Sequence, residues 1–192
     1  YTFGRQIGQG GFGTVYIAQD RSNGHVYAAK VFKIPNHNHR RRYKLEETAR
    51  NEVDMLRSLN HPNIIKFEDV LDDPGLVLVM EYIPDGNLLD FGDTTMPEKL
   101  IVLKSILSAL GYLHDKNITH RDAKPENILI NRPFIPKLSD FGLSSAKVRL
   151  VTRCGTEAYL APEIRQPGYD SKVDVWSLGL VLLETLSILP ED

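Results

Sequence analysis

The residue pattern changes at one point of the chain, and this change constrains the fold more than any other feature. Before Pro84-Asp85-Gly86, short runs rich in Val, Ile, Tyr and Phe predict strands at 3–9, 13–20, 25–33, 64–71 and 75–82, with a helix at 43–59. After it, apolar spacing predicts a long helix ending near Asn117, strands at 128–131 and 135–139, and an apolar helix at 171–189. The sequence therefore predicts a sheet-rich part, a hinge at 84–86 and a helix-rich part.

Composition excludes several classes of protein. The 192 residues are 42% hydrophobic and 25% charged with a net charge of −2, so no overall field requires nucleic acid or an anionic membrane. The longest apolar stretch, 175–189, contains Ser177 and Glu184 and is too short and polar to cross a bilayer. The single Cys154 cannot form an internal disulfide, and the N-terminus does not resemble a signal peptide. We expect an intracellular protein, cytoplasmic or nuclear, with no membrane partner.

A histidine- and arginine-rich segment spans residues 36–42. Histidine clusters bind metals and arginine runs bind phosphate, so this segment allows a metal or nucleic-acid interpretation. It lies between the third predicted strand and the first helix. We interpret it as a solvated connecting loop and predict no nucleic-acid partner.

Residues 8–15 form a glycine-rich turn, Gly-Gln-Gly-Gly-Phe-Gly-Thr-Val. Glycines at this spacing let backbone N–H groups approach phosphate oxygens. A dinucleotide-binding turn would be followed by a helix, whereas the residues after Thr14 favour a strand. A phosphate-binding loop and an ordinary hairpin turn both remain open.

Lys30 lies in the apolar strand after this turn. A lysine on such a strand usually extends to solvent. Glu52, on the following helix, is a candidate partner that would hold Lys30 toward phosphates.

The segment His120-Arg121-Asp122-Ala123-Lys124-Pro125-Glu126-Asn127 carries the strongest chemical signal. A carboxylate such as Asp122 can accept the proton of an alcohol, and Lys124 can neutralise charge on a transferred phosphoryl group. The amide oxygen of Asn127 suits Mg²⁺. The alternative is a solvated polar loop, but a chance match of this length is improbable. The segment predicts phosphoryl transfer.

Three further motifs follow in order: Asp140-Phe141-Gly142, the run from Gly155 to Glu163, and the run from Asp174 to Gly179. With the motifs above, the chain resembles the eukaryotic protein kinase family over essentially its whole length. The resemblance implies one kinase domain over 1–192 with an α+β, bilobal protein-kinase-like fold: a β-rich N-lobe at 1–83 and a partial helical C-lobe at 84–192.

The family's domain continues beyond the last predicted helix. We therefore expect the fold to be incomplete at the C-terminus, with side chains of that helix, Leu178 and Val181 among them, only partly covered.

The resemblance also assigns an ATP site. Gly8, Gly10 and Gly13 would cover the phosphates. The adenine would lie among Ile7, Val15, Ala28 and Leu129, with Met80 behind it and the backbone of Glu81 and Ile83 at its edge.

The same resemblance assigns the catalytic groups. Lys30, paired with Glu52, would contact the α- and β-phosphates; Asp122 would be the catalytic base and Lys124 would stabilise the transferring group. Asn127 and Asp140 would hold Mg²⁺.

Two positions resemble the serine/threonine type. These are Lys124 and Thr156, the latter seven residues before Glu163, and the whole resembles the calcium/calmodulin-kinase-like or checkpoint-kinase-like branch. The implied activity is transfer of the γ-phosphoryl group of ATP to Ser or Thr hydroxyls of protein substrates. A nucleotide-binding or scaffold protein without turnover is the alternative.

Regulation is implied by Arg121 and Thr152. Thr152 stands where the family's phosphosite usually falls, for an activating kinase or autophosphorylation, and its phosphate could pair with Arg121. An ordinary exposed threonine remains the alternative.

Overall fold

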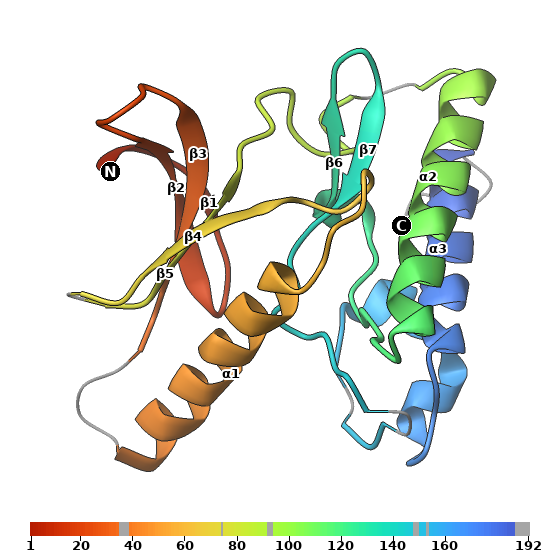
Figure 1. The fold of residues 1–192 in the computed structure, drawn as a ribbon. Coiled ribbons are helices and arrows are strands. Elements are labelled where there is room, and N and C mark those ends of the chain that lie inside the picture. Colours follow the sequence, from red (N-terminus) through yellow and green to blue (C-terminus); the bar gives the residue numbers. More distant parts are fainter. Residues whose placement is uncertain (35–38, 74, 92–93, 148–149, 153, 187–192) are drawn as a thin grey trace. The chain divides into compact units, whose positions relative to one another are not determined.

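The computed structural model describes residues 1–34, 39–73, 75–91, 94–147, 150–152 and 154–186 (Figure 1). The chain forms two compact units. The first comprises Tyr1–Asn60 and Ile65–Ile83, and the second comprises His61–Ile64 and Pro84–Asp192.

The first unit contains an antiparallel sheet of five strands in the order β1-β2-β3-β5-β4. Their bounds are Thr2–Gln9 (β1), Gly13–Gln19 (β2), Val26–Phe32 (β3), Phe67–Leu71 (β4) and Val77–Glu81 (β5), close to the five predicted ranges. Directly opposed residues share a face of the sheet. Val15 lies opposite Lys30, and Ala28 opposite Met80, so these four share one face. The other face carries a buried cluster that includes Ala29 and Val79.

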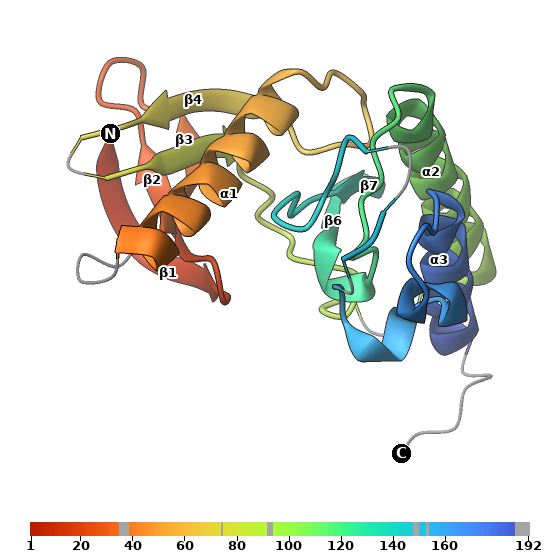
Figure 2. The ribbon, with the colours of Figure 1, turned by 90° about the horizontal axis from the view of Figure 1, so that it is seen from below.

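Helix α1, His39–Arg57, packs against the sheet of the first unit (Figure 2). Its buried residues recur every three to four positions, as expected for a helix with one covered face: Ala49, Glu52, Val53 and Leu56. The helix begins four residues earlier than predicted. The prediction of a loop over 36–42 is therefore wrong for 39–42, because arginine is a good helix former. Residues 36–38 lie outside the described part of the chain.

The second unit is built on two helices, α2 (Met96–Asp115) and α3 (Lys172–Thr185), which pack against each other. Thr95 caps α2 in a capping box with Glu98. The strands β6 (Ile128–Asn131) and β7 (Ile135–Leu138) form an antiparallel ribbon, and β7 packs on α2. Three short 3₁₀ turns complete the unit: Pro125–Asn127, Glu157–Tyr159 and Pro162–Arg165.

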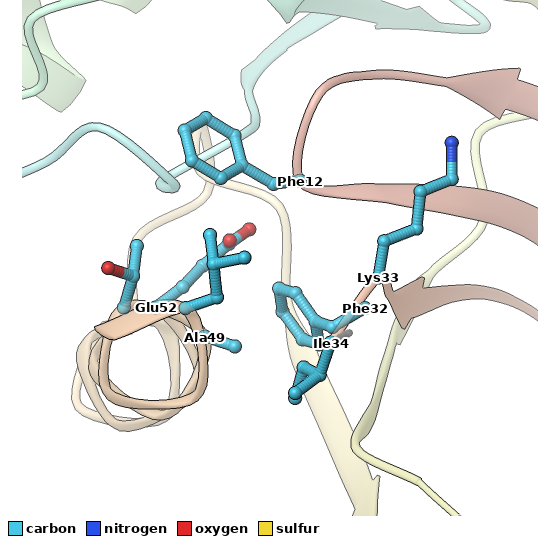
Figure 3. A pocket seen from close by; sticks show the side chains of 8 residues that line it. Phe12, Phe32, Lys33, Ile34, Ala49 and Glu52 are labelled. Carbon is cyan, nitrogen blue, oxygen red and sulfur yellow. The ribbon is translucent and has the colours of Figure 1, made fainter. Parts of the chain in front are cut away.

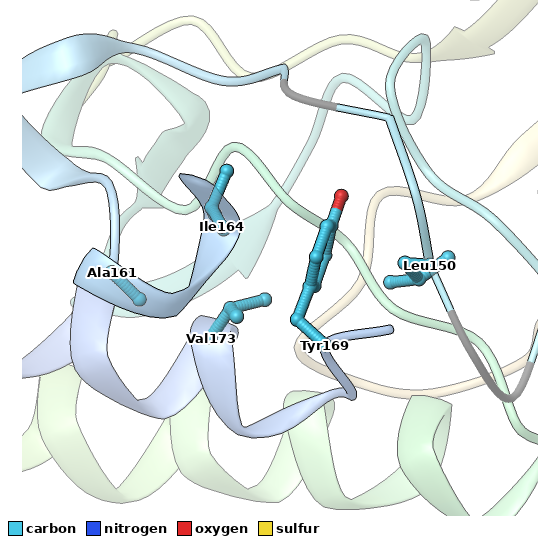
Figure 4. Close-up of a cluster of buried hydrophobic side chains, with 5 residues drawn as sticks. All are labelled: Leu150, Ala161, Ile164, Tyr169 and Val173. Carbon is cyan, nitrogen blue, oxygen red and sulfur yellow. The ribbon is translucent and has the colours of Figure 1, made fainter. Parts of the chain in front are cut away.

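A buried cluster ties the irregular segment before α3 to that helix (Figure 4). Its members are Leu150, Ala161, Ile164, Tyr169 and Val173. Backbone hydrogen bonds reinforce it, since the N–H of Leu150 donates to the carbonyl of Tyr169 at 3.0 Å. The cluster thus fixes a stretch that has little regular secondary structure.

Helix α3 is better covered than predicted. Leu178 and Val181 are 1% and 0% exposed, so the expectation of partial cover is wrong for both, because α2 and the turn at 157–159 pack against this helix. Val175 and Trp176 are exposed by nearly half. The predicted end of the helix at 189 lies outside the described residues. None of the helices in the described ranges has the length and apolarity that crossing a membrane requires.

Candidate active site

Lys30 and Glu52 form a buried ion pair in the first unit. β3 places Lys30 and α1 places Glu52, and Nζ lies 2.7 Å from Oε1. The side chains are 8% and 4% exposed. Nζ also lies 5.4 Å from the centre of the Phe32 ring. Since a buried charge needs a well-placed partner, the position of Lys30 depends on that of α1.

The glycines of the turn between β1 and β2 differ in their surroundings. The N–H of Gly10 donates to the carbonyl of Gly13 at 2.9 Å and closes the turn. A Cβ atom at Gly13 would lie 2.6 Å from the backbone oxygen of Val31, whereas one at Gly8 would make only ordinary contact with Val15 and one at Gly10 would meet none of the described atoms within 4 Å. Strand packing thus accounts for Gly13. Gly8 and Gly10 need another reason, and close approach of a phosphate would supply one.

The residues expected around adenine are distributed over both units. In the first unit, Val15 and Ala28 share the sheet face of Lys30. Ile7 on β1 is exposed, and Ile83 is buried.

The N–H of Glu81 donates to the carbonyl of Lys66 at 2.9 Å, so this N–H does not face adenine. Leu129 belongs to β6 of the second unit, opposite Lys137.

Asp122 is the centre of a hydrogen-bond network in the second unit. Its Oδ1 accepts from the backbone N–H of Thr156 at 2.9 Å and from the Thr156 hydroxyl at 2.8 Å. Its Oδ2 accepts from Nδ2 of Asn127 at 3.0 Å. Lys124 Nζ donates to Thr156 Oγ1 at 2.8 Å and lies 3.4 Å from Asp122 Oδ2. A carboxylate, an ammonium group, a hydroxyl and an amide are thereby held together.

Asn127 and Asp140 lie at the same end of the β6–β7 ribbon. Ile128 and Leu138 are paired, and the N–H and hydroxyl of Ser139 both contact the carbonyl of Asn127, at 2.9 and 3.1 Å. Because the Asn127 amide nitrogen donates to Asp122, its side-chain oxygen is turned away from that carboxylate. Asp140 has the rare left-handed backbone conformation, with φ 57°.

These two side chains fit Mg²⁺, which proteins hold through one or two oxygen ligands together with substrate phosphates. The described residues contain no group of three or more His, Cys, Asp or Glu side chains that would form a protein-only metal site.

Sequence reasoning placed Asp174 of α3 in a motif but gave it no role, and the structure shows that it holds the backbone of the segment that carries Asp122. The Asp174 carboxylate is fully buried and accepts from the N–H groups of His120 and Arg121 at 2.9 and 2.7 Å. His114 Nε2 lies 2.8 Å from the same carboxylate. The sequence signal was an aspartate next to Val173 and Val175 in a helix rich in apolar residues, since a buried charge there requires partners.

His120 supports the loop from within. Its Nδ1 accepts from the N–H of Asp122 at 3.3 Å, and its Nε2 lies 3.0 Å from the carbonyl of Ser139. This network requires the tautomer with the proton on Nε2. The ring also makes an edge-on contact with Phe141, with centroids 5.0 Å apart. His120 thus links the segment of Asp122 to that of Asp140.

Arg121 and Thr152 are connected through Tyr169. The Tyr169 hydroxyl donates to the carbonyl of Thr152. Burial raises the pKa of Tyr169, while the neighbouring Arg121 acts in the opposite direction. Arg121 itself has φ 70°, and its Nε is buried without a hydrogen-bond partner among the described residues. A buried guanidinium nitrogen without a partner is a suitable donor to an anion.

Comparisons with known proteins show the family of this chain. The sequence matches the protein kinase domain over residues 1–190. It is 39% identical to the serine/threonine-protein kinase cds1 of Schizosaccharomyces pombe, over 97% of this chain and 44% of that protein. It is 38% identical to myosin light chain kinase A of Dictyostelium discoideum (94% and 64%), and 40% identical to human calcium/calmodulin-dependent protein kinase type 1B (94% and 54%). The chain spans about half the length of the curated relatives it matches.

The chain therefore belongs to the protein kinase family. The predicted resemblance to the serine/threonine type is confirmed by the names of these relatives, and the predicted kinase fold class by the family match.

Proposed function

We propose that this chain transfers the γ-phosphoryl group of ATP to serine or threonine hydroxyls of protein substrates. The network around Asp122 is the observation that carries the proposal. A carboxylate accepts about four hydrogen bonds. Thr156 and Asn127 supply three of them here, so the carboxylate is fixed in place and retains capacity for a substrate hydroxyl.

In the proposed reaction the hydroxyl proton passes to Asp122 as the hydroxyl oxygen bonds to the γ-phosphorus. The bond from that phosphorus to the β-phosphate oxygen breaks, and ADP leaves. Lys124, 3.4 Å from Asp122, would offset the negative charge on the transferring group. Lys30, held by Glu52, would contact the α- and β-phosphates. Mg²⁺ held by Asn127 and Asp140 would neutralise phosphate charge.

The test is transfer of labelled phosphate from ATP to a protein substrate in the presence of Mg²⁺. Asp122→Asn keeps the size of the side chain but removes the base, and we expect a loss of about 10²- to 10⁴-fold in rate. Asp115→Asn, at an exposed position on α2, is the matched control and should retain activity. Equal activity in the parent and Asp122→Asn would contradict the assignment. No transfer, together with a nucleotide-dependent rise in melting temperature, would indicate the alternative of a binding protein without turnover.

The same site gives a regulatory proposal. Phosphate on Thr152 would add a charge of about −2, and we infer that it pairs with Arg121, whose Nε has no hydrogen-bond partner among the described residues. Intact mass reports whether the chain carries the phosphate. We expect the chain phosphorylated on Thr152 to transfer phosphate to substrate faster than the Thr152→Ala variant does. Equal rates would contradict the regulatory role and leave Thr152 as an ordinary threonine.

A further inference from the structure

A small pocket in the first unit lies between the glycine-rich turn, the end of β3 and α1 (Figure 3). Phe32, Lys33 and Ile34 line it from β3 and the residues that follow, and Leu45, Thr48, Ala49 and Glu52 line it from α1. Phe12 is the residue that the glycine-rich turn contributes. Its ring projects from the turn toward α1 (Figure 3).

The backbone of Phe12 is held beside this pocket by a hydrogen bond to β3. The N–H of Lys33 donates to the carbonyl of Phe12 at 3.0 Å, which extends the pairing of Gly13 with Phe32 by one residue. The turn is closed on its other side by the hydrogen bond from Gly10 to Gly13. Phe12 is thus the large apolar side chain of the turn between Gly8 and Gly13, and its main chain is anchored to β3.

Two walls of this pocket also surround Lys30. Glu52 is the partner of Lys30 at 2.7 Å, and the Phe32 ring lies beneath the Lys30 ammonium group. Attraction between opposite charges weakens steeply when water reaches them. Removing the Phe12 ring would open the pocket beside Glu52 to solvent.

We propose that Phe12 is a positioning residue that couples the glycine-rich turn to α1 and shields the Lys30–Glu52 pair from water. This inference rests on the proposed function for its kinetic consequence, but not for its structural one. In this arrangement the Phe12 ring supports α1 and keeps Glu52 on Lys30. Without the ring, α1 and the ion pair lose this support.

The test is a double-mutant cycle of Phe12→Ala with Glu52→Gln. We expect Phe12→Ala to lower kcat for phosphoryl transfer about tenfold in the parent and less than twofold when Glu52 is already Gln, a coupling within the range for residues that share a cavity. Phe12→Leu, which keeps an apolar side chain, should restore most of the rate. Phe3→Ala is the matched control, since Phe3 lies on β1 with 43% exposure and is not part of this pocket.

Amide hydrogen exchange of the nucleotide-free chain provides a readout that needs no activity. We expect faster exchange in α1 around Ala49–Val53 in Phe12→Ala than in Phe3→Ala. Equal losses of rate in both Glu52 backgrounds, or exchange in α1 that Phe12→Ala does not alter, would overturn the proposal. If the parent itself transfers no phosphate, the proposed function fails, while the exchange experiment still decides the role of Phe12.

Discussion

At the scale of single residues, Gly13 and Gly10 belong to one turn but have different reasons to be glycine. A Cβ atom at Gly13 would collide with the backbone oxygen of Val31 at 2.6 Å, and backbone atoms cannot move aside without disturbing the β2–β3 pairing. A Cβ atom at Gly10 would point into open space as far as the described residues define it. Strand packing therefore requires glycine at position 13, whereas the space beside Gly10 is open to a ligand.

We predict that Gly13→Ala lowers the free energy of unfolding by about 1–3 kcal/mol, as overpacking typically does. Gly10→Ala should change it by less than about 0.5 kcal/mol, as for surface positions, yet weaken nucleotide binding by bringing a methyl group between backbone and phosphate. Chemical denaturation and calorimetric titration with Mg-ATP measure the two effects. Similar stability losses in both variants would contradict this division of roles.

At the scale of elements, His61 joins the segment after α1 to α2. Its Nδ1 accepts from the N–H of Asn63 at 3.1 Å, its Nε2 lies 3.2 Å from the hydroxyl of Ser108, and its ring packs on Tyr112 with centroids 5.2 Å apart. Burial lowers the pKa of His61 below its usual 6.5, and the positive charge of Lys137 lowers it further. The neutral ring is therefore the form that the folded chain favours.

The sign of the pH dependence follows from this shift. With a lowered pKa, the unfolded chain binds a proton at His61 more readily than the folded chain. The stability that the neutral ring contributes is complete above about pH 6.5 and is lost as the pH falls through the folded pKa. We predict a flatter decline of stability below pH 6.5 in His61→Asn, which keeps an acceptor near Nδ1. Denaturation of both proteins at pH 8 measures the packing loss alone, and identical slopes in acid would refute the prediction.

At the scale of the whole molecule, the residues proposed to bind ATP and Mg²⁺ belong to both compact units: Lys30 to the first and Asp140 to the second. A ligand that binds only the folded chain stabilises it and raises its melting temperature. At a ligand concentration one hundred times Kd, the gain in the free energy of unfolding is about 2.7 kcal/mol. Because the residues proposed to bind nucleotide and Mg²⁺ come from both units, we predict that Lys30→Met and Asp140→Asn each reduce the shift that Mg-ATP produces. The comparison uses the shift within each variant, since Lys30→Met also leaves Glu52 buried without its partner. A full shift in either variant would exclude that residue from the nucleotide site.

Much of the fold could be predicted because it follows from local patterns. Within the described residues, alternating and apolar runs predicted the seven strands to within a few residues, and the spacing of residues such as Val53 and Leu56 predicted the three helices. The start of α1 was missed because the arginines at 40–42 carry no apolar periodicity, so their helix propensity decided that boundary. Side chains of the candidate site were found as motifs because the chemistry of phosphoryl transfer requires those residue types at short spacing.

Neighbouring residues specify the order of the elements and the types of side chain that we propose to react. Which distant groups meet depends on the folded arrangement. Asp174 lies more than fifty residues from the backbone N–H groups that it binds, Thr156 lies 34 residues from Asp122, and Phe12 covers a pocket shared with Glu52. The physical reason is that a buried carboxylate or an open pocket acquires its partner through packing, and packing depends on the whole arrangement of helices and strands rather than on any stretch of the chain.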